Sequence, residues 1–137
     1  MLRVSPDGKE VWVQTSDADT NVVLDAETLA TVATTPVGRQ PVTLAFQPGP
    51  GRYGLVTHQQ DGKIVVLDRR TGREVKRIDV GKPQANTAFT PDGATAFVSV
   101  MGGSEVVALD MGELAIIARI PTGGQPMGLV LLDPDAP

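Results

Sequence analysis

Turn and strand residues recur along the whole chain at a spacing of 42 or 43 residues. Ser5-Pro6-Asp7-Gly8 returns in type as Thr90-Pro91-Asp92-Gly93, with a Pro-Gly-rich turn at 47–51 between them and Asp133-Pro134-Asp135 beyond. Two further series keep the same spacing, a Leu-Asp pair and a turn proline: Leu24-Asp25, Leu67-Asp68 and Leu109-Asp110, and Pro41, Pro83 and Pro126. A fixed period of this length indicates a repeat architecture in which each unit packs on its neighbours.

Each repeat holds four short segments rich in β-branched residues. In the middle repeat these predicted strands are Val42–Phe46, Tyr53–His58, Lys63–Asp68 and Glu74–Val80. Pro-Asp-Gly suits the turns between strands, because proline presets φ, aspartate bonds its own backbone and glycine tolerates the exit geometry. A helix is disfavoured because Gly, Pro or β-branched residues interrupt every window. The sequence therefore predicts an all-β chain of four-stranded antiparallel units.

The strand Ile64–Leu67 is apolar on both faces, as expected for a sheet packed between two neighbouring sheets. Sheets stacked around an axis in this way are the blades of a β-propeller. We expect one domain over residues 1–137, with blades at about 5–41, 42–83 and 84–126 and an additional first strand at 127–132. Leu2–Val4 is expected to be only a stub of the N-terminal copy of that strand.

The second strand of each repeat reads Trp12-Val13-Gln14-Thr15, Leu55-Val56-Thr57-His58 and Phe97-Val98-Ser99-Val100. Together with the Pro-Asp-Gly, Leu-Asp and Val-Gly-x-x-Pro elements, this pattern resembles the YVTN family of β-propeller repeats over essentially the whole chain. The Asn that ends the family's Tyr-Val-Thr-Asn motif is missing from all three segments. WD-type repeats are disfavoured, because their Gly-His and Trp-Asp pairs are missing. The resemblance implies a scaffold found mostly in bacterial and archaeal proteins, often exported, with many functions.

Charge is unevenly distributed along the 137 residues, whose net charge is −4. The middle third is basic, and its cluster of Arg69, Arg70, Arg73, Lys76 and Arg77 is interrupted by Glu74 and lacks interleaved aromatic residues. A solvated outer strand is therefore favoured over a nucleic-acid surface. We expect no membrane span, since the apolar segments are strand-sized, and no signal peptide in this chain. The absence of cysteine excludes disulfides and leaves the compartment open.

Three blades are fewer than a closed ring usually needs. The sequence predicts completion by a homodimer with six blades, in which Met127–Leu132 of one chain pairs beside Val11–Gln14 of the other. The alternative is a fragment of a longer propeller. In both interpretations further blades cover the two open ends of the array, from a second copy in the first and from the rest of a longer chain in the second.

Ligands of propellers usually bind around the central channel, where the loops between blades and between the second and third strands emerge. We expect these loops to form a polar rim suited to a small anion or a peptide carboxylate, although ordinary solvated loops remain the competing interpretation. The rim would carry Arg39, Gln40, His58, Gln59, Gln60, Lys82, Gln84, Asn86, Met101 and Gln125.

No catalytic constellation occurs in the sequence. A single histidine, His58, makes a protein-only metal site improbable, and Asp17 and Asp19 lack the spacing of a calcium loop. The repeated aspartates Asp25, Asp68 and Asp110 are explained by turn capping. We therefore expect no catalytic residue, metal or cofactor, and a non-enzymatic scaffold or binding module. The alternative is part of a redox enzyme, similar to haem d1 propellers, or of a hydrolytic enzyme.

Overall fold

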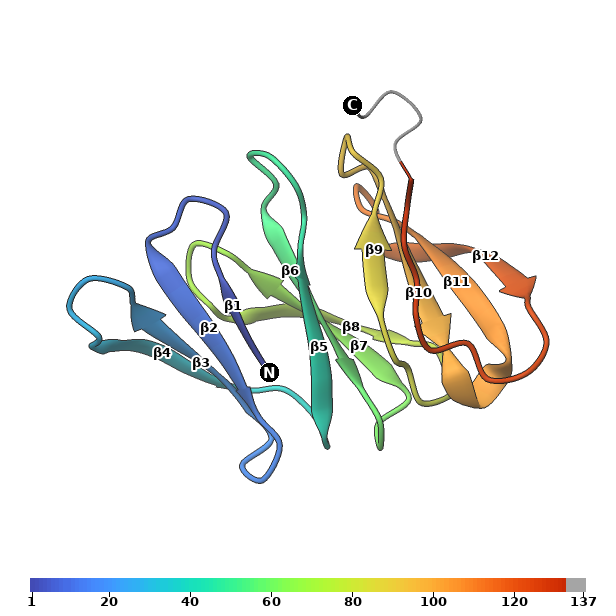
Figure 1. Cartoon of the computed structure of the whole chain (residues 1–137), viewed down its shortest axis with the longest axis horizontal. Helices are drawn as coiled ribbons and strands as arrows, with labels where there is room; N and C mark the ends of the chain where they lie inside the picture. The colour runs from blue at the N-terminus through green and yellow to red at the C-terminus, as the bar shows by residue number, and fades with distance from the viewer. Residues whose placement is uncertain (133–137) are drawn as a thin grey trace.

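The computed structural model describes residues 1–132 and contains three four-stranded antiparallel sheets (Figure 1). In each sheet the strands are hydrogen-bonded in chain order. The first sheet holds β1 (Leu2–Val4), β2 (Glu10–Thr15), β3 (Thr20–Asp25) and β4 (Thr31–Pro36). The second holds β5 (Pro41–Phe46), β6 (Tyr53–His58), β7 (Lys63–Asp68) and β8 (Glu74–Asp79). The third holds β9 (Thr87–Phe89), β10 (Thr95–Val100), β11 (Glu105–Asp110) and β12 (Ala115–Pro121), with a 3-10 turn η1 (Met101–Gly103) after β10.

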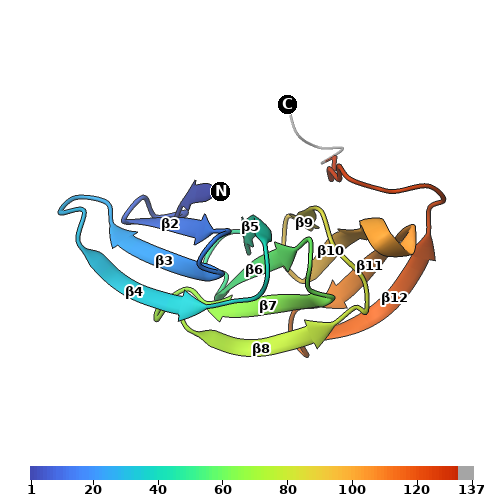
Figure 2. The same ribbon diagram turned by 90° about the horizontal axis from the view of Figure 1, so that it is seen from below.

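The sheets follow one another side by side, and the first strands β1, β5 and β9 lie on one side of the array while β4, β8 and β12 lie on the other (Figure 2). This arrangement confirms the predicted all-β architecture of three four-stranded blades. Among the described residues, no helix is long and apolar enough to cross a membrane.

The Pro-Asp-Gly turns have the predicted geometry. Ser5 Oγ donates to Asp7 Oδ1 at 2.6 Å, and Thr90 Oγ1 donates to Asp92 Oδ1 at the same distance. The hydroxyl donor is the main reason why the pKa of each of these carboxyl groups lies below its ordinary value. Gly8 follows Asp7 with a φ of 74°, a left-handed conformation that favours glycine. The same local chemistry thus starts the second strand of two blades.

The Leu-Asp series also has one role in every blade. Asp25 Oδ1 accepts from the backbone N–H of Thr28 at 2.7 Å, Asp68 Oδ1 from Arg70 at 2.8 Å, and Asp110 Oδ1 from Glu113 at 2.7 Å. Each carboxylate therefore caps the turn between the third and fourth strands, as the sequence predicted.

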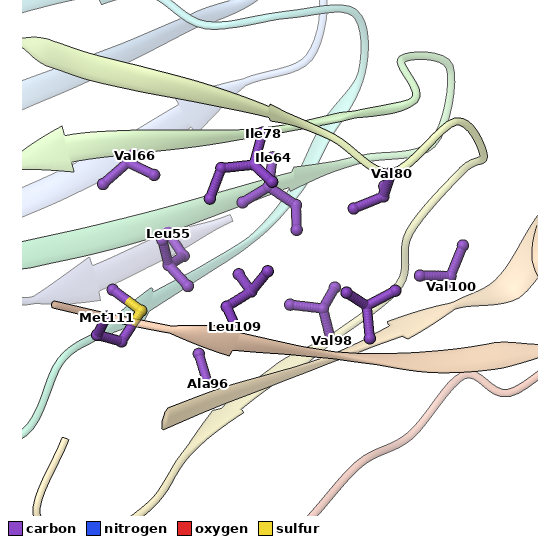
Figure 3. Packing of buried hydrophobic residues seen from close by; sticks show 11 residues of the cluster. Leu55, Ile64, Val66, Ile78, Val80, Ala96, Val98, Val100, Leu109 and Met111 are labelled. Carbon is purple, nitrogen blue, oxygen red and sulfur yellow. The ribbon is translucent and has the colours of Figure 1, made fainter. Parts of the chain in front are cut away.

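Two apolar clusters hold the sheets together, one at each junction. Alternate side chains of β7 serve both: Val65 and Leu67 pack toward the first sheet, and Ile64 and Val66 toward the third. Trp12 anchors the first junction, its ring meeting Phe46 edge to face with centroids 5.3 Å apart. At the second junction the side chains of the middle sheet face Val98, Val100 and Leu109 of the third (Figure 3). The middle sheet is thus covered on both faces.

The structure differs from the sequence predictions at both ends of the array. Leu2–Val4 is a paired strand of the first sheet, with Leu2 opposite Val13, so it belongs to the first blade. Met127–Leu132, by contrast, forms no strand in the part of the chain described, although it was predicted to be one. The physical reason is that, within residues 1–132, no strand of a following blade lies beside it. The segment contacts β10 through Ser99 Oγ, which donates to Met127 O at 3.1 Å.

Candidate functional site

Two of the predicted rim residues, His58 and Gln84, are fully buried. Gln84 accepts from the His58 backbone N–H at 3.1 Å and donates through Nε2 to Asp61 O at 3.0 Å. Its own backbone N–H donates to His58 O at 2.9 Å. Gln84 therefore fastens the connection between the second and third sheets to the end of β6. Its amide is occupied by backbone groups.

The His58 ring lies at the contact between the first and second sheets. Nδ1 is 2.9 Å from Lys63 O, and because a carbonyl only accepts, Nδ1 carries the proton and Nε2 is a bare acceptor. Nε2 has no hydrogen-bond partner. It faces Gly38, where an added Cβ would come within 3.0 Å of Nε2 and 2.8 Å of Asp61 Oδ2. Burial is the main cause of a lowered pKa of His58, so the imidazole is neutral near pH 7.

The other predicted rim residues lie on separate loops. Arg39 and Gln40 are exposed on the connection from β4 to β5, where Gln40 N donates to Asp19 Oδ1 at 3.1 Å. Lys82 is exposed before β9, and Gln125 is exposed in the last connection. Gln59 and Gln60 are exposed after β6, and Met101 begins η1. Within the described residues no group of three or more His, Cys, Asp and Glu side chains is placed to hold a metal.

A groove of about 420 Å³ lies between β5 and β9, the innermost strands of the second and third sheets. Asn86 is the one predicted rim residue on it. Sequence reasoning missed the rest, since alternating Thr and Ala on a strand give no ligand signal. The lining residues are Arg3, Thr43, Leu44, Ala45, Phe46, Pro48, Asn86, Thr87, Ala88, Phe89, Thr90 and Pro91.

A second recess of about 310 Å³ lies where the turn before β2 meets the β5–β6 loop, and it includes part of the basic cluster. Two of its arginines, Arg52 and Arg69, are engaged with the protein. Arg52 Nε donates to Asp68 Oδ2 at 2.8 Å, and this hydrogen bond is the main cause of a raised pKa of Arg52. Arg69 donates to the carbonyls of Gln47 and Gly51 and lies over the Phe46 ring. Arg52 and Arg69 therefore fasten loops in this region.

Comparison with known proteins places the fold in a class. No family model and no curated protein matches the chain. Among solved structures, hydrazine synthase of Kuenenia stuttgartiensis is similar over 90% of this chain and 36% of its own, with 25% identity and a TM-score of 0.82. The dihydro-heme d1 dehydrogenase NirN matches over 88% and 27%, with 20% identity and a TM-score of 0.76. The Swd1 β-propeller domain of Myceliophteria thermophila matches over 92% and 41%, with 16% identity and a TM-score of 0.74.

The three stacked sheets and these similarities define a protein with the β-propeller fold. The chain spans well under half the length of the solved chains it matches. Two of those chains are named as enzymes and one is named only as a β-propeller domain, so the shared fold does not itself select an activity.

Proposed function

We propose that this chain is a non-enzymatic binding scaffold of the YVTN repeat type, which closes a six-bladed ring with a second copy of itself. The observation that carries the proposal is the complementarity of its two open ends. The free face of the third sheet repeats the face by which the second sheet packs on the third. The free face of the first sheet repeats the face by which the second sheet packs on the first.

The free face of the third sheet contains Phe97, Val106, Ala108 and Ile120, as the register shows: Phe97 lies opposite Ala108 and Val106 opposite Ile120. One period earlier, the corresponding positions of the second sheet are Leu55, Ile64, Val66 and Ile78, which belong to the second junction. Ile120 is 44% exposed where its counterpart Ile78 is 6% exposed. The third sheet is therefore apolar at the positions that a following blade would cover.

The free face of the first sheet contains Val13, Val22 and Leu24, one period before Val56, Val65 and Leu67 of the first junction. Leu2 extends it, lying opposite Val13, and is 60% exposed. Because each end matches a packed face, the third sheet of one copy fits the first sheet of another. Two such contacts related by a two-fold axis close a ring without a free sheet face.

In the strand exchange predicted from the sequence, Met127–Leu132 of one copy pairs with β2 of the other, but that edge of β2 is already paired. β1 already pairs with β2 at the position that Met127–Leu132 of the partner would take. Exchange therefore requires β1 to leave, whereas packing of the free faces leaves it in place. We propose closure through the faces, with exchange as the variant in which β1 is displaced.

Light scattering after size-exclusion chromatography tests closure. The expected mass is twice the 14.4 kDa of one chain. Ile120→Asp places a charge on the free face and is expected to halve the mass without changing the circular dichroism spectrum. Val75→Asp is the matched control, because Val75 is 46% exposed at the rim of the middle sheet. A single-chain mass for the wild type at all micromolar concentrations contradicts the proposal, as does an unchanged mass for Ile120→Asp.

A second candidate is a section of a larger propeller enzyme, redox or hydrolytic. It is favoured by the partial coverage of the matched chains, two of which are named as a hydrazine synthase and a dihydro-heme d1 dehydrogenase. The visible spectrum and the metal content of the purified protein separate the two candidates. Colour or stoichiometric metal supports the enzyme, and the absence of both supports the scaffold.

A further inference from the structure

We propose that the groove between β5 and β9 binds a small carboxylate with a flat apolar body, held by Arg3, Asn86 and Thr87. The inference deepens the binding role proposed above and rests on it, but it does not require ring closure. Its basis is a set of hydrogen-bond donors without acceptors, beside aromatic and proline side chains.

The first donor is Arg3 of β1. Arg3 lies opposite Trp12 in the register, so its side chain leaves the sheet on the Trp12 face, toward the second sheet. It lines the groove beside β5, and within residues 1–132 its guanidinium makes neither a salt bridge nor a side-chain hydrogen bond. A guanidinium in this position offers a carboxylate two parallel N–H donors.

The second donor is the hydroxyl of Thr87 on β9. Thr87 is 8% exposed, and its Oγ1 is buried without a hydrogen-bond partner. Thr43 on the facing strand differs, since its hydroxyl donates to Ala85 O at 2.8 Å. A buried hydroxyl without a partner is destabilising, so a ligand oxygen that accepts from it is bound favourably.

The third donor is the side-chain amide of Asn86. Its Oδ1 accepts from the backbone N–H of Thr87 at 2.8 Å, which fixes the orientation of the amide. The Nδ2 donors have no hydrogen bond to the described residues. All three residues line one groove, and they carry one positive charge between them.

The remaining walls are apolar. Phe46, Phe89, Pro48 and Pro91 line the groove, and Ala45 and Ala88 are small enough to leave room. A volume of about 420 Å³ is that of a small-molecule site. Hydrogen-bond donors in one part of the groove and flat apolar side chains in another favour a ligand with one carboxylate attached to a planar or compact apolar group.

Benzoate is the probe, and benzamide is the neutral control of the same shape. In a ¹H–¹⁵N titration of the full chain, benzoate is expected to shift the amides of Asn86, Thr87 and Ala88, and benzamide to bind about tenfold more weakly or not at all. Shifts confined to the loops around Arg52 and Arg70, or equal binding of the two probes, overturn the inference.

Two variants sharpen the titration. Arg3→Gln is expected to weaken benzoate binding about tenfold, whereas Arg73→Gln, the same charge change on an exposed turn far along the chain, leaves it unchanged. Thr87→Val keeps the shape of the side chain and is expected to weaken binding severalfold while preserving the fold. Unchanged affinity in both Arg3→Gln and Thr87→Val contradicts the site.

The mass measured on the same sample separates this inference from ring closure. A single-chain mass with benzoate bound at the groove overturns the dimer and supports the site. A dimer with no shifts at Asn86–Ala88 overturns the site and leaves the dimer.

Discussion

The two junctions between sheets have the same backbone geometry but different chemistry. At the second junction, four positions contributed by β6, β7 and β8 are apolar: Leu55, Ile64, Val66 and Ile78. One period earlier at the first junction, Asn21 and Thr35 stand where Ile64 and Ile78 stand later. The propeller fold thus tolerates buried polar groups at strand positions that are apolar one period later. The difference predicts that the first junction is the weaker of the two.

Three buried side-chain atoms at the first junction have no hydrogen-bond partner in the described residues. Gln14 Nε2 donates to Asn21 Oδ1 at 2.6 Å, but Gln14 Oε1 and Asn21 Nδ2 have no partner, and neither has His58 Nε2. Each such atom removes part of the free energy gained by burial. The apolar anchor that opposes this loss is Trp12, which is fully buried.

Trp12→Ala is expected to have the largest effect. The substitution leaves a cavity among Val23, Leu44 and Phe46 and is expected to lower the free energy of unfolding by about 3–5 kcal/mol. Urea unfolding followed by circular dichroism measures this change. Trp12→Phe is the control and retains part of the stability. If Trp12→Ala lowers the free energy of unfolding by less than Val65→Ala or Val66→Ala does, the first junction does not depend on Trp12.

Val65→Ala and Val66→Ala compare the junctions directly, because the two residues are neighbours on β7, both fully buried, and face opposite sheets. Each is expected to lower the free energy of unfolding by about 2 kcal/mol. Hydrogen exchange distinguishes them: Val65→Ala accelerates exchange in β2 and β3 first, and Val66→Ala in β10 and β11. Indistinguishable exchange patterns would show that the junctions unfold as one unit.

Much of this architecture could be predicted from the sequence, because the turns are specified locally. Pro-Asp-Gly and the Leu-Asp caps act within a few residues, so the strands of the middle sheet fall within a residue of their predicted limits. Leu2–Val4 was predicted as a short copy of the first strand but was placed outside the first blade, and Met127–Leu132 was predicted as a strand that the described structure does not form. Both differences arise because pairing depends on a neighbouring strand that local sequence does not reveal. The burial of Gln84 and the groove at Thr87 also arise from tertiary packing, and polar residue types gave no sign of either.

Asn21→Ile tests whether the polar pair weakens the first junction. Alone it is expected to destabilise the protein by about 1–2 kcal/mol, because Gln14 then loses its remaining partner. Combined with Gln14→Val, which removes that amide, the change is expected to be neutral or stabilising by about 1 kcal/mol. Thermal unfolding of the single and double variants measures both. A double variant less stable than Asn21→Ile alone would show that the polar pair supports the junction.

His58 gives the smallest effect, a pH dependence confined to the first junction. Its pKa in the folded protein lies below the ordinary value of 6.5, because burial disfavours the charged ring despite the nearby carboxylates Asp61 and Asp19, with Arg77 adding to the effect. The unfolded chain therefore binds a proton more readily than the folded protein. The contribution of neutral His58 to the free energy of unfolding is fully present above about pH 6.5. It falls as the pH is lowered toward the pKa of His58 in the folded protein, by at most about 1.4 kcal/mol per pH unit. The carboxyl groups of Asp7, Asp25, Asp68 and Asp92 have lowered pKa values and titrate in more acidic solution.

Urea unfolding between pH 7 and pH 5 should thus show a free energy of unfolding that falls as the pH is lowered in the wild type but not in His58→Gln. An equal fall in both proteins would mean that another group titrates. Because the ring lies at the first junction, the fluorescence of Trp12 should report the loss before circular dichroism does.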